Sequence, residues 1–447
     1  TIGSRVTVSG EVHLILADNA SLTVDGGINV AEGKSFSVYA QSVGEKMGTL
    51  TATGENGAGI GGGSWENAGT ITINGGSVTA TGGYNQAGIG GGDQVSGGTV
   101  TINGGSVAAT GGEEAAGIGS GSEGSGGTVT INGGSVAATA GNAAAGIGSG
   151  SSGSYDNITI NGGTVTATGG QEAAGIGSVA NGSYGNITIN GGNVTAIGGD
   201  LAAGIGGGYK GSGGNITISG GSVTATGADE GAGIGSGFQG SGGSFTTETD
   251  GHALIVANGG ISDKSNQSGW RGIIFDGDNG KVYGDQTLQK DLEIKSGKTL
   301  TVPENTTLTV KDGVTLTNNG TITGNGTLDS EGNLVGSGTV AQTITNNLQK
   351  DSAVSVTVSP SSATYGSKVS ITATISKAAT ISRAATISKA ANAITRAAEN
   401  QVEFFVGTGG NKTSLGTANV EGDTATLSDV EISQEKGFAI GENTITA

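Results

Sequence analysis

The sequence contains no cysteine, which excludes disulfide bonds, thiolate metal sites and a cysteine nucleophile. Only 2 of the 447 residues are proline, so the 94 glycines cannot belong to a collagen triple helix, which needs proline in bulk. No apolar run of about 18 residues occurs, and we therefore expect no membrane-spanning segment. Aromatic residues make up only 4% of the chain, so the places where they occur are informative.

Basic residues are also few. The chain has 19 Lys and Arg against 37 Asp and Glu, and its sequence pI of about 4.4 argues against a nucleic-acid partner, which needs a basic face. Charged residues make up only 13%, so the composition is not the highly charged one of a disordered chain. Because the chain starts at Thr1, without an initiator Met, we expect a piece of a longer protein.

The dominant feature is an internal repeat of constant length, without insertions or deletions. The string AGIG occurs seven times. TITINGG or a close variant follows the first six copies in the same register, with SVTAT or a variant after it, and Ser244-Phe245-Thr246 is a decayed seventh copy. Each AGIG string starts 29 positions after the one before it. The seven strings begin at Ala58, Ala87, Ala116, Ala145, Ala174, Ala203 and Ala232.

Within each string, residues alternate with a period of two, which predicts β-strands. In TITI, Ile71 and Ile73 face one side, and in AGIG we expect Ala58 and Ile60 to face inward while the glycines face outward. Asn-Gly-Gly and Gly-Gly turns separate the strings. The density of glycine and β-branched residues excludes helix.

Three strands per unit of constant length predict an all-β fold, a parallel β-helix with 29-residue, three-strand coils. Stacking places the isoleucines in internal columns and Asn74, Asn103, Asn132, Asn161 and Asn190 in an amide ladder at a corner. We expect regular repeats over about 57–247, and irregular capping coils on both sides that extend the β-helix over 1–345.

Glycine becomes rarer near residue 346, and short alternating strands follow. The segments VTVSP, VEFF and the closing NTITA resemble bacterial immunoglobulin-like domains of the group 3 type, over residues 352–447. This resemblance implies an Ig-like β-sandwich that acts as a spacer or adhesive module. An alanine-rich, basic stretch at about 375–400 is interpreted as an insertion in that domain, with no assigned role.

The strings TITINGGSVTATGG and AGIGGG also resemble the glycine-rich parallel β-helix surface proteins of Gram-positive gut bacteria. Some relatives in that group bind carbohydrate. The resemblance therefore implies an extracellular or cell-wall-associated protein whose partner is a polysaccharide, a host glycan or a surface protein.

An enzyme interpretation would make the chain a polysaccharide lyase or hydrolase. Such lyases use an Arg or Lys base and acidic clusters that hold Ca²⁺. Between residues 51 and 250 the only basic residue is Lys210, and the acids there follow no ligand spacing. We expect no catalytic residues, no metal site and no cofactor, although the sequence leaves calcium open.

Aromatic residues cluster in the loop after the AGIG strand, six to ten positions beyond the repeat alanine. Stacked coils would bring most of them to one edge, where exposed rings can stack on sugar faces. The alternative is that the rings fold over the loop and seal the core, which the uneven offsets favour. The candidate glycan-binding residues are Trp65, Tyr155, Tyr184, Tyr209 and Phe238.

Together these features predict a monomeric, non-enzymatic adhesin or stalk that is secreted or attached to a cell surface. Such a protein either projects the Ig-like module on a rigid β-helix or binds carbohydrate along the side of the β-helix. A purely structural spacer is the first alternative, and a polysaccharide lyase or hydrolase is the second.

Overall fold

A computed structural model describes residues 1–348 except 126, 155–156, 183–184 and 249, and then 353–359, 368–376, 401–406, 413–421, 424–431 and 445–446. The chain divides into two compact units. The first comprises Thr1–Gln286 and Gly297–Thr306, and the second comprises Thr287–Ser296 and Thr307–Ala447. No helix in the described part of the chain is long and apolar enough to cross a membrane.

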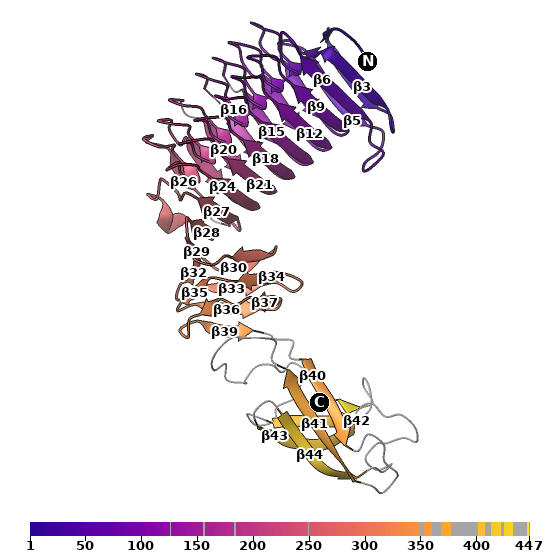
Figure 1. Cartoon of the computed structure of the whole chain (residues 1–447), viewed down its shortest axis with the longest axis vertical. Helices are drawn as coiled ribbons and strands as arrows, with labels where there is room; N and C mark the ends of the chain where they lie inside the picture. Colours follow the sequence, from indigo (N-terminus) through magenta and orange to yellow (C-terminus); the bar gives the residue numbers. More distant parts are fainter. Residues whose placement is uncertain are drawn as a thin grey trace. The chain divides into compact units, whose positions relative to one another are not determined.

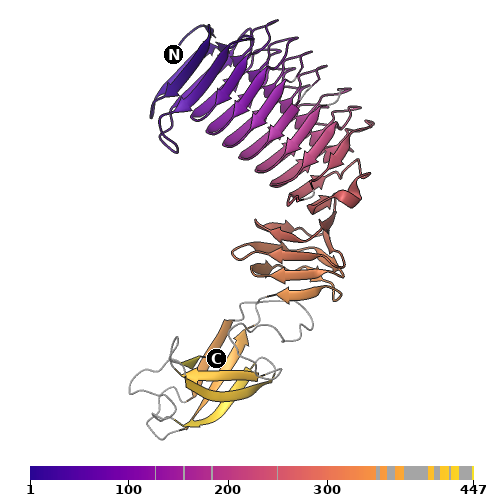
Figure 2. The ribbon, with the colours of Figure 1, turned by 180° about the vertical axis from the view of Figure 1, so that it is seen from behind.

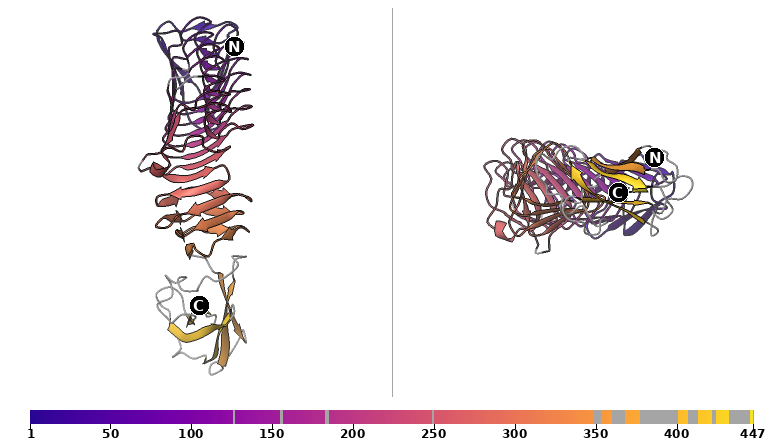
Figure 3. Two further views of the ribbon diagram at one scale, coloured as in Figure 1. Left: turned by 90° about the vertical axis from the view of Figure 1, so that its left-hand side faces the viewer. Right: turned by 90° about the horizontal axis from the view of Figure 1, so that it is seen from below.

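The first unit is a parallel β-helix, as the constant repeat length predicts. Each regular coil contributes one strand to each of three parallel sheets, and neighbouring strands pair equivalent repeat positions, as Ile89 does with Ile118. The strands of successive coils lie side by side in Figure 1, from indigo to pink. Figure 3 (left) shows the coils of this unit one above another.

We name the sheets after their strings. The AGIG sheet holds β1 (Val6–Thr7), β4 (Ile28–Asn29), β7 (Ile60–Gly61), β10 (Ile89–Gly90), β13 (Ile118–Gly119), β16 (Ile147–Gly148), β19 (Ile176–Gly177), β22 (Ile205–Gly206) and β25 (Ile234–Gly235). The TITI sheet holds β2 (Glu11–Leu16), β5 (Ser35–Ala40), β8 (Thr70–Ile73), β11 (Thr99–Ile102), β14 (Thr128–Ile131), β17 (Asn157–Ile160), β20 (Asn186–Ile189), β23 (Asn215–Ile218) and β26 (Ser244–Thr246).

The SVTAT sheet begins with β3 (Ser21–Gly26), β6 (Thr49–Gly54), β9 (Ser77–Thr81), β12 (Ser106–Thr110), β15 (Ser135–Thr139), β18 (Thr164–Thr168), β21 (Asn193–Ile197), β24 (Ser222–Thr226) and β27 (Leu254–Asn258). It continues with β28 (Gly272–Asp276), β29 (Asn279–Tyr283) and β32 (Thr299–Val302). The pair β28 and β29 is antiparallel, a hairpin that the repeat does not predict.

The predicted internal columns are confirmed. The isoleucines of the AGIG strands and those of the TITI strands are fully buried from Ile60 to Ile234 and from Ile73 to Ile218. Burial of one such side chain contributes about 1.5–3 kcal/mol, which offsets part of the entropy lost in ordering the glycines. The amide ladder is confirmed too, because each Asn side chain donates to the preceding one, with 2.8 Å between Asn103 Nδ2 and Asn74 Oδ1.

The AGIG glycines, which the sequence predicts to face outward from the core, are not exposed to solvent. Gly59 and Gly61 are buried, because the turns on either side of the strand fold over it. Gly61 has φ +141°, and the carbonyl oxygen of Gly90 in the next coil fills the place where a Cβ would stand. Glycine is therefore required at this position by close backbone approach.

Different side chains close the two ends of the regular stack. At the first coils, the Arg5 guanidinium donates to the carbonyl oxygens of Gly26, Ala58, Gly61 and Gly62 at 2.9–3.2 Å. Burial lowers the pKa of this guanidinium from its usual value.

At the other end an aromatic cluster covers the core. Trp270 is buried, meets Phe245 and Tyr283 edge to face with centroids 4.9 and 5.5 Å away, and donates from Nε1 to the Phe245 carbonyl. Trp270 follows the 3-10 helix η1 (Gln267–Gly269), which belongs to the segment that leads into β28. The cluster ends the isoleucine columns with large rings in place of another coil.

The second unit contains parallel coils that are smaller than the regular ones. Paired residues there lie closer together in the chain than in the regular coils of the first unit, as in Thr315 with Asn333 and Leu292 with Leu316. Its parallel strands are β31 (Leu292–Ile294), β33 (Thr307–Val310), β34 (Thr315–Asn318), β35 (Thr321–Gly324), β36 (Thr327–Ser330), β37 (Asn333–Val335), β38 (Thr339–Val340) and β39 (Thr345–Leu348), and β30 (Gln286–Leu288) spans the boundary between the units. Figure 2 shows these strands from behind, in orange.

The described C-terminal strands form one antiparallel sheet in the order β40-β41-β44-β43-β42-β45. Their bounds are β40 (Ala353–Ser359), β41 (Lys368–Ser376), β42 (Gln401–Val406), β43 (Thr413–Glu421), β44 (Thr424–Glu431) and β45 (Ile445–Thr446). The Ig-like sandwich over 352–447 and the domain boundary at 345 stay predictions. Most of the predicted insertion at 375–400 lies outside the described residues.

Candidate functional site

Two columns of turns cover the AGIG sheet. We call the turn before each AGIG strand the leading turn and the turn after it the trailing turn. The two columns contact each other through the backbone: Tyr209 N donates to Glu172 O at 2.9 Å, and Phe238 N donates to Leu201 O at 2.8 Å. The trailing turns keep one left-handed residue at the same repeat position: Trp65, Gln94, Glu123, Ser152, Asn181, Lys210 and Gln239.

Charge is confined to these turns. Within residues 67–247, no described strand of the three sheets carries an ionised side chain, and the outward strand positions are Ser, Thr, Asn, Ala and Ile. The described charged residues of this region are Asp93, Glu113, Glu114, Glu123, Glu172, Asp200, Lys210, Asp229 and Glu230. The turn face therefore combines acidic and aromatic side chains, whereas the two sheet faces are neutral.

Two of the predicted aromatic residues stack on one another. The rings of Tyr209 and Phe238, in successive trailing turns, have centroids 6.3 Å apart and planes 21° apart. Lys210 Nζ lies 4.8 Å from the Tyr209 ring centre, and the Tyr209 hydroxyl donates to Gln239 Oε1 at 3.4 Å. Both rings are half-exposed, so they present a partly open apolar surface.

The other candidates have different positions. Trp65 is 67% exposed, in the first trailing turn, so its ring does not seal the core. It lies six coils before Gln239 in the repeat and takes no part in the Tyr209–Phe238 stack. Tyr155 and Tyr184 lie outside the described residues.

A cavity of about 330 Å³ opens where the regular turns stop. After β25, Ile261 forms only an isolated parallel bridge with Ile234, and the chain then leaves the AGIG sheet. No further regular turn follows, so the last leading and trailing turns keep one uncovered side. The cavity is lined by Glu230, Ala232, Ser236, Gly237, Phe238, Gln239, Gly259, Gly260, Ile261, Ser262, Lys264 and Asp276.

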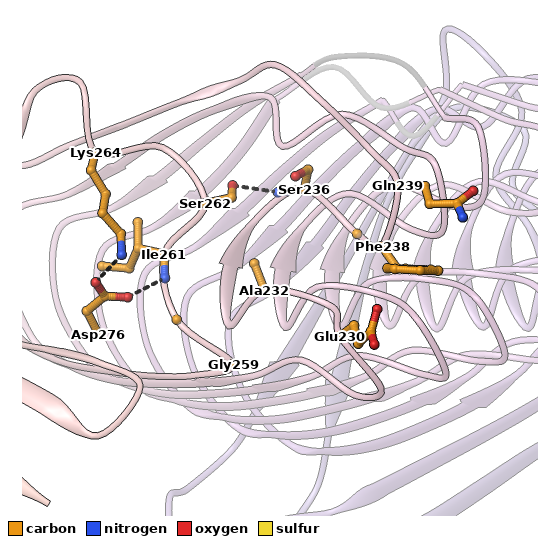
Figure 4. Close-up of a pocket in the computed structure, with 12 residues that line it drawn as sticks. Glu230, Ala232, Ser236, Phe238, Gln239, Gly259, Ile261, Ser262, Lys264 and Asp276 are labelled. Carbon is orange, nitrogen blue, oxygen red and sulfur yellow. Dashed lines mark hydrogen bonds and ion pairs between the residues drawn. The ribbon is translucent and has the colours of Figure 1, made fainter.

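Polar contacts fix the far wall of this cavity. Lys264 Nζ pairs with Asp276, and Asp276 Oδ1 also accepts from Ile261 N at 2.8 Å. Ser262 Oγ accepts from Ser236 N at 3.0 Å. Figure 4 shows the Phe238 ring and the Glu230 carboxylate on one side of the cavity and the Lys264–Asp276 pair on the other.

Asp263 holds the loop that forms this wall. Its carboxylate accepts from Ser265 N at 3.1 Å and from Phe245 N at 3.3 Å. The Ser265 amide, helped by the Ser265 hydroxyl and the Phe245 amide, lowers the pKa of Asp263 against the opposing effect of burial. An ionised Asp263 therefore ties the wall to β26.

Sequence reasoning missed several side chains on this face. Tyr84 is 66% exposed in a leading turn, and its hydrogen bond to Glu113 raises the pKa of its hydroxyl. Partial burial raises the pKa of Asp93, with Glu114 adding to the effect. Lys264 and Asp276 follow the last repeat, where no periodic signal marks them.

The histidines take no part in this site. His13 is exposed and lies 3.1 Å from Glu11, while His252 Nδ1 lies 3.1 Å from Gln286 Oε1. Among the described residues, no three His, Cys, Asp or Glu side chains gather in a metal-binding geometry.

The architecture defines the class of protein as a parallel β-helix repeat protein. Seven segments match the family model described as Beta helix repeat, namely residues 48–64, 71–93, 100–122, 129–151, 158–183, 187–209 and 216–238. No curated protein and no solved structure matches the chain. The last matched segment ends at Phe238, one of the residues that line the cavity.

Proposed function

We propose that this chain is a non-enzymatic, secreted or cell-surface adhesin or stalk that binds carbohydrate on the turn face of its β-helix. The observation that carries the proposal is the stacked, half-exposed Tyr209–Phe238 pair beside a polar-lined cavity. A flat apolar ring with a few polar groups around it is the usual arrangement for holding a sugar ring.

The chemistry of the cavity walls supports binding better than catalysis. Asp276 is held by Lys264 and by a backbone amide, so its carboxylate is a fixed acceptor with little freedom to transfer protons. Glu230 stands across the cavity from Asp276, which is already paired with Lys264. A lyase or hydrolase therefore has less support here than a binding protein.

The test is a glycan array with the intact chain, followed by titration of each retained glycan against Phe238→Ala and Tyr39→Ala. Tyr39 is the matched control, since it is an exposed ring on β5, away from the turn face. We expect Phe238→Ala to weaken binding about fivefold or more, because a ring contact is worth roughly 1 kcal/mol or above. Tyr39→Ala should leave the affinity unchanged.

Silence on the array would favour the structural spacer. Binding that survives Phe238→Ala together with Tyr209→Ala would place the ligand elsewhere on the chain. Slow release of shorter oligosaccharides from a bound polysaccharide would instead support the enzyme alternative.

A further inference from the structure

The charges around the cavity are unbalanced. The cavity is lined by one lysine, Lys264, and two carboxylates, Glu230 and Asp276. Lys264 is neutralised by Asp276, and Lys210 lies over the Tyr209 ring. The net charge around the cavity is therefore negative, and a bound ligand experiences a negative electrostatic potential in a partly enclosed site.

Glu230 is the carboxylate available to a ligand. It lines the cavity, and within the described part of the chain it makes no ion pair. Its backbone is left-handed, with φ +72° next to Asp229 at φ +40°, so the turn holds the side chain at the edge of the cavity. The same repeat position carries Leu201 one coil earlier and Glu172 before that.

The aromatic side of the cavity favours the same kind of ligand. Phe238 offers a ring face to the C–H face of a sugar and also attracts a cation close to it. A volume of about 330 Å³ is at the lower end for small-molecule sites, which suits one or two sugar rings.

An acidic sugar fits this site poorly. Its carboxylate would have to displace Asp276 from Lys264, and it would stand in the field of Glu230. If the sugar displaces Asp276, the Asp276 carboxylate is left unpaired at a partly buried position. If it does not, the sugar carboxylate is itself unpaired there, and both outcomes are unfavourable.

We propose that the cavity takes a saccharide with a free ammonium group, an amino sugar that is not acetylated, stacked on Phe238 and paired with Glu230. This inference rests on the proposed carbohydrate-binding function and names its ligand class. An ammonium within about 4 Å of an exposed carboxylate gains roughly fivefold in affinity at low salt, and this gain is screened at high salt.

The experiment compares three oligosaccharides of equal length by calorimetric titration of the intact chain: a glucosamine oligomer, its N-acetylated form and a galacturonate oligomer. Each is measured at 20 mM and 500 mM NaCl. The variants are Glu230→Gln, which keeps the side-chain shape, and Glu123→Gln as the matched control. Glu123 lies in a trailing turn four coils away, roughly 19 Å at the strand spacing and beyond the screening length.

We expect about fivefold tighter binding of the glucosamine oligomer than of its acetylated form at low salt, and no such difference at high salt. Glu230→Gln should remove the difference and leave the acetylated oligomer unaffected, while Glu123→Gln changes neither. Equal binding of the glucosamine and acetylated forms, or tightest binding of galacturonate, overturns the amino-sugar assignment but leaves the proposed function standing. If none of the three binds and the glycan array is also silent, the proposed function fails as well.

Discussion

The carbonyl oxygen of Gly148 occupies the place where a Cβ on Gly119 would stand, one coil away in the AGIG sheet. Gly119 also has φ +140°, which side chains disfavour. The same relation recurs from Gly61 to Gly206, so each coil requires glycine at this position because of the coil that follows it.

Gly119→Ala should therefore destabilise the β-helix strongly. The added methyl group has to push two coils apart, and we expect a loss of more than about 3 kcal/mol in the free energy of unfolding. Gly10→Ala is the control, because nothing lies within 4 Å of its Cβ position. Urea unfolding followed by circular dichroism measures both, and equal stability of the two variants would contradict the close-approach argument.

The amide ladder should contribute in proportion to the bonds made by each rung. Asn132 donates to Asn103 at 2.8 Å and accepts from Asn161 at 2.7 Å, whereas Asn74 at the end only accepts from Asn103. Because these amides are exposed, we expect Asn132→Ala to cost about 1–2 kcal/mol and Asn74→Ala about half as much. Thermal unfolding of both variants checks the ratio. An equal loss of stability would show that the number of hydrogen bonds at a rung does not set its contribution.

Trp270 should be the most important single side chain at the far end of the regular stack. Its side chain is 1% exposed and contacts two rings edge to face. Trp270→Ala therefore creates a cavity, and we expect it to lower the free energy of unfolding by about 3–5 kcal/mol. Trp270→Phe keeps an aromatic ring but loses the bond from Nε1 to the Phe245 carbonyl, and should cost less. Chemical denaturation ranks the variants, and a loss below about 1 kcal/mol for alanine would mean that the cluster is not tightly packed.

Acid should loosen the wall of the cavity. Because the Ser265 amide lowers the pKa of Asp263 below its usual 3.8, the ionised form is stabilised by folding. This contribution is present above pH 3.8 and is lost as the pH falls through the lower folded pKa. Melting temperatures between pH 2.5 and 6 for wild type and Asp263→Asn test this, and the two curves should converge at the acidic end.

Asp93 provides the opposite case. Burial raises the pKa of Asp93, so ionising this carboxyl group opposes folding. Its ionisation therefore lowers the free energy of unfolding as the pH rises above 3.8. As the pH rises, the melting temperature of Asp93→Asn should therefore increase slightly relative to wild type, whereas that of Asp263→Asn should decrease relative to wild type. The same sign for both variants would contradict one of the two assigned environments.

Much of the fold follows from the repeat alone. The unchanging length of the repeat predicts stacking, and the period of two within each string predicts which isoleucines are buried and which asparagines form the ladder. The candidate site was only partly predictable. The offsets of Tyr209 and Phe238 place them in successive turns, but the contact between their rings depends on how those turns fold.

Periodicity in the chain is enough to predict the parallel β-helix, its coil length and its inward columns, because every coil repeats the same pattern. Three features emerge from the folded chain and not from its pattern: the turns fold over the AGIG strands and bury their glycines, Trp270 closes the core, and Lys264 and Asp276 face Phe238 across a cavity. The Trp270 cluster and the cavity arise where the repeat meets a non-repeating segment. Their contacts join residues with no fixed spacing, so no local pattern in the chain encodes them.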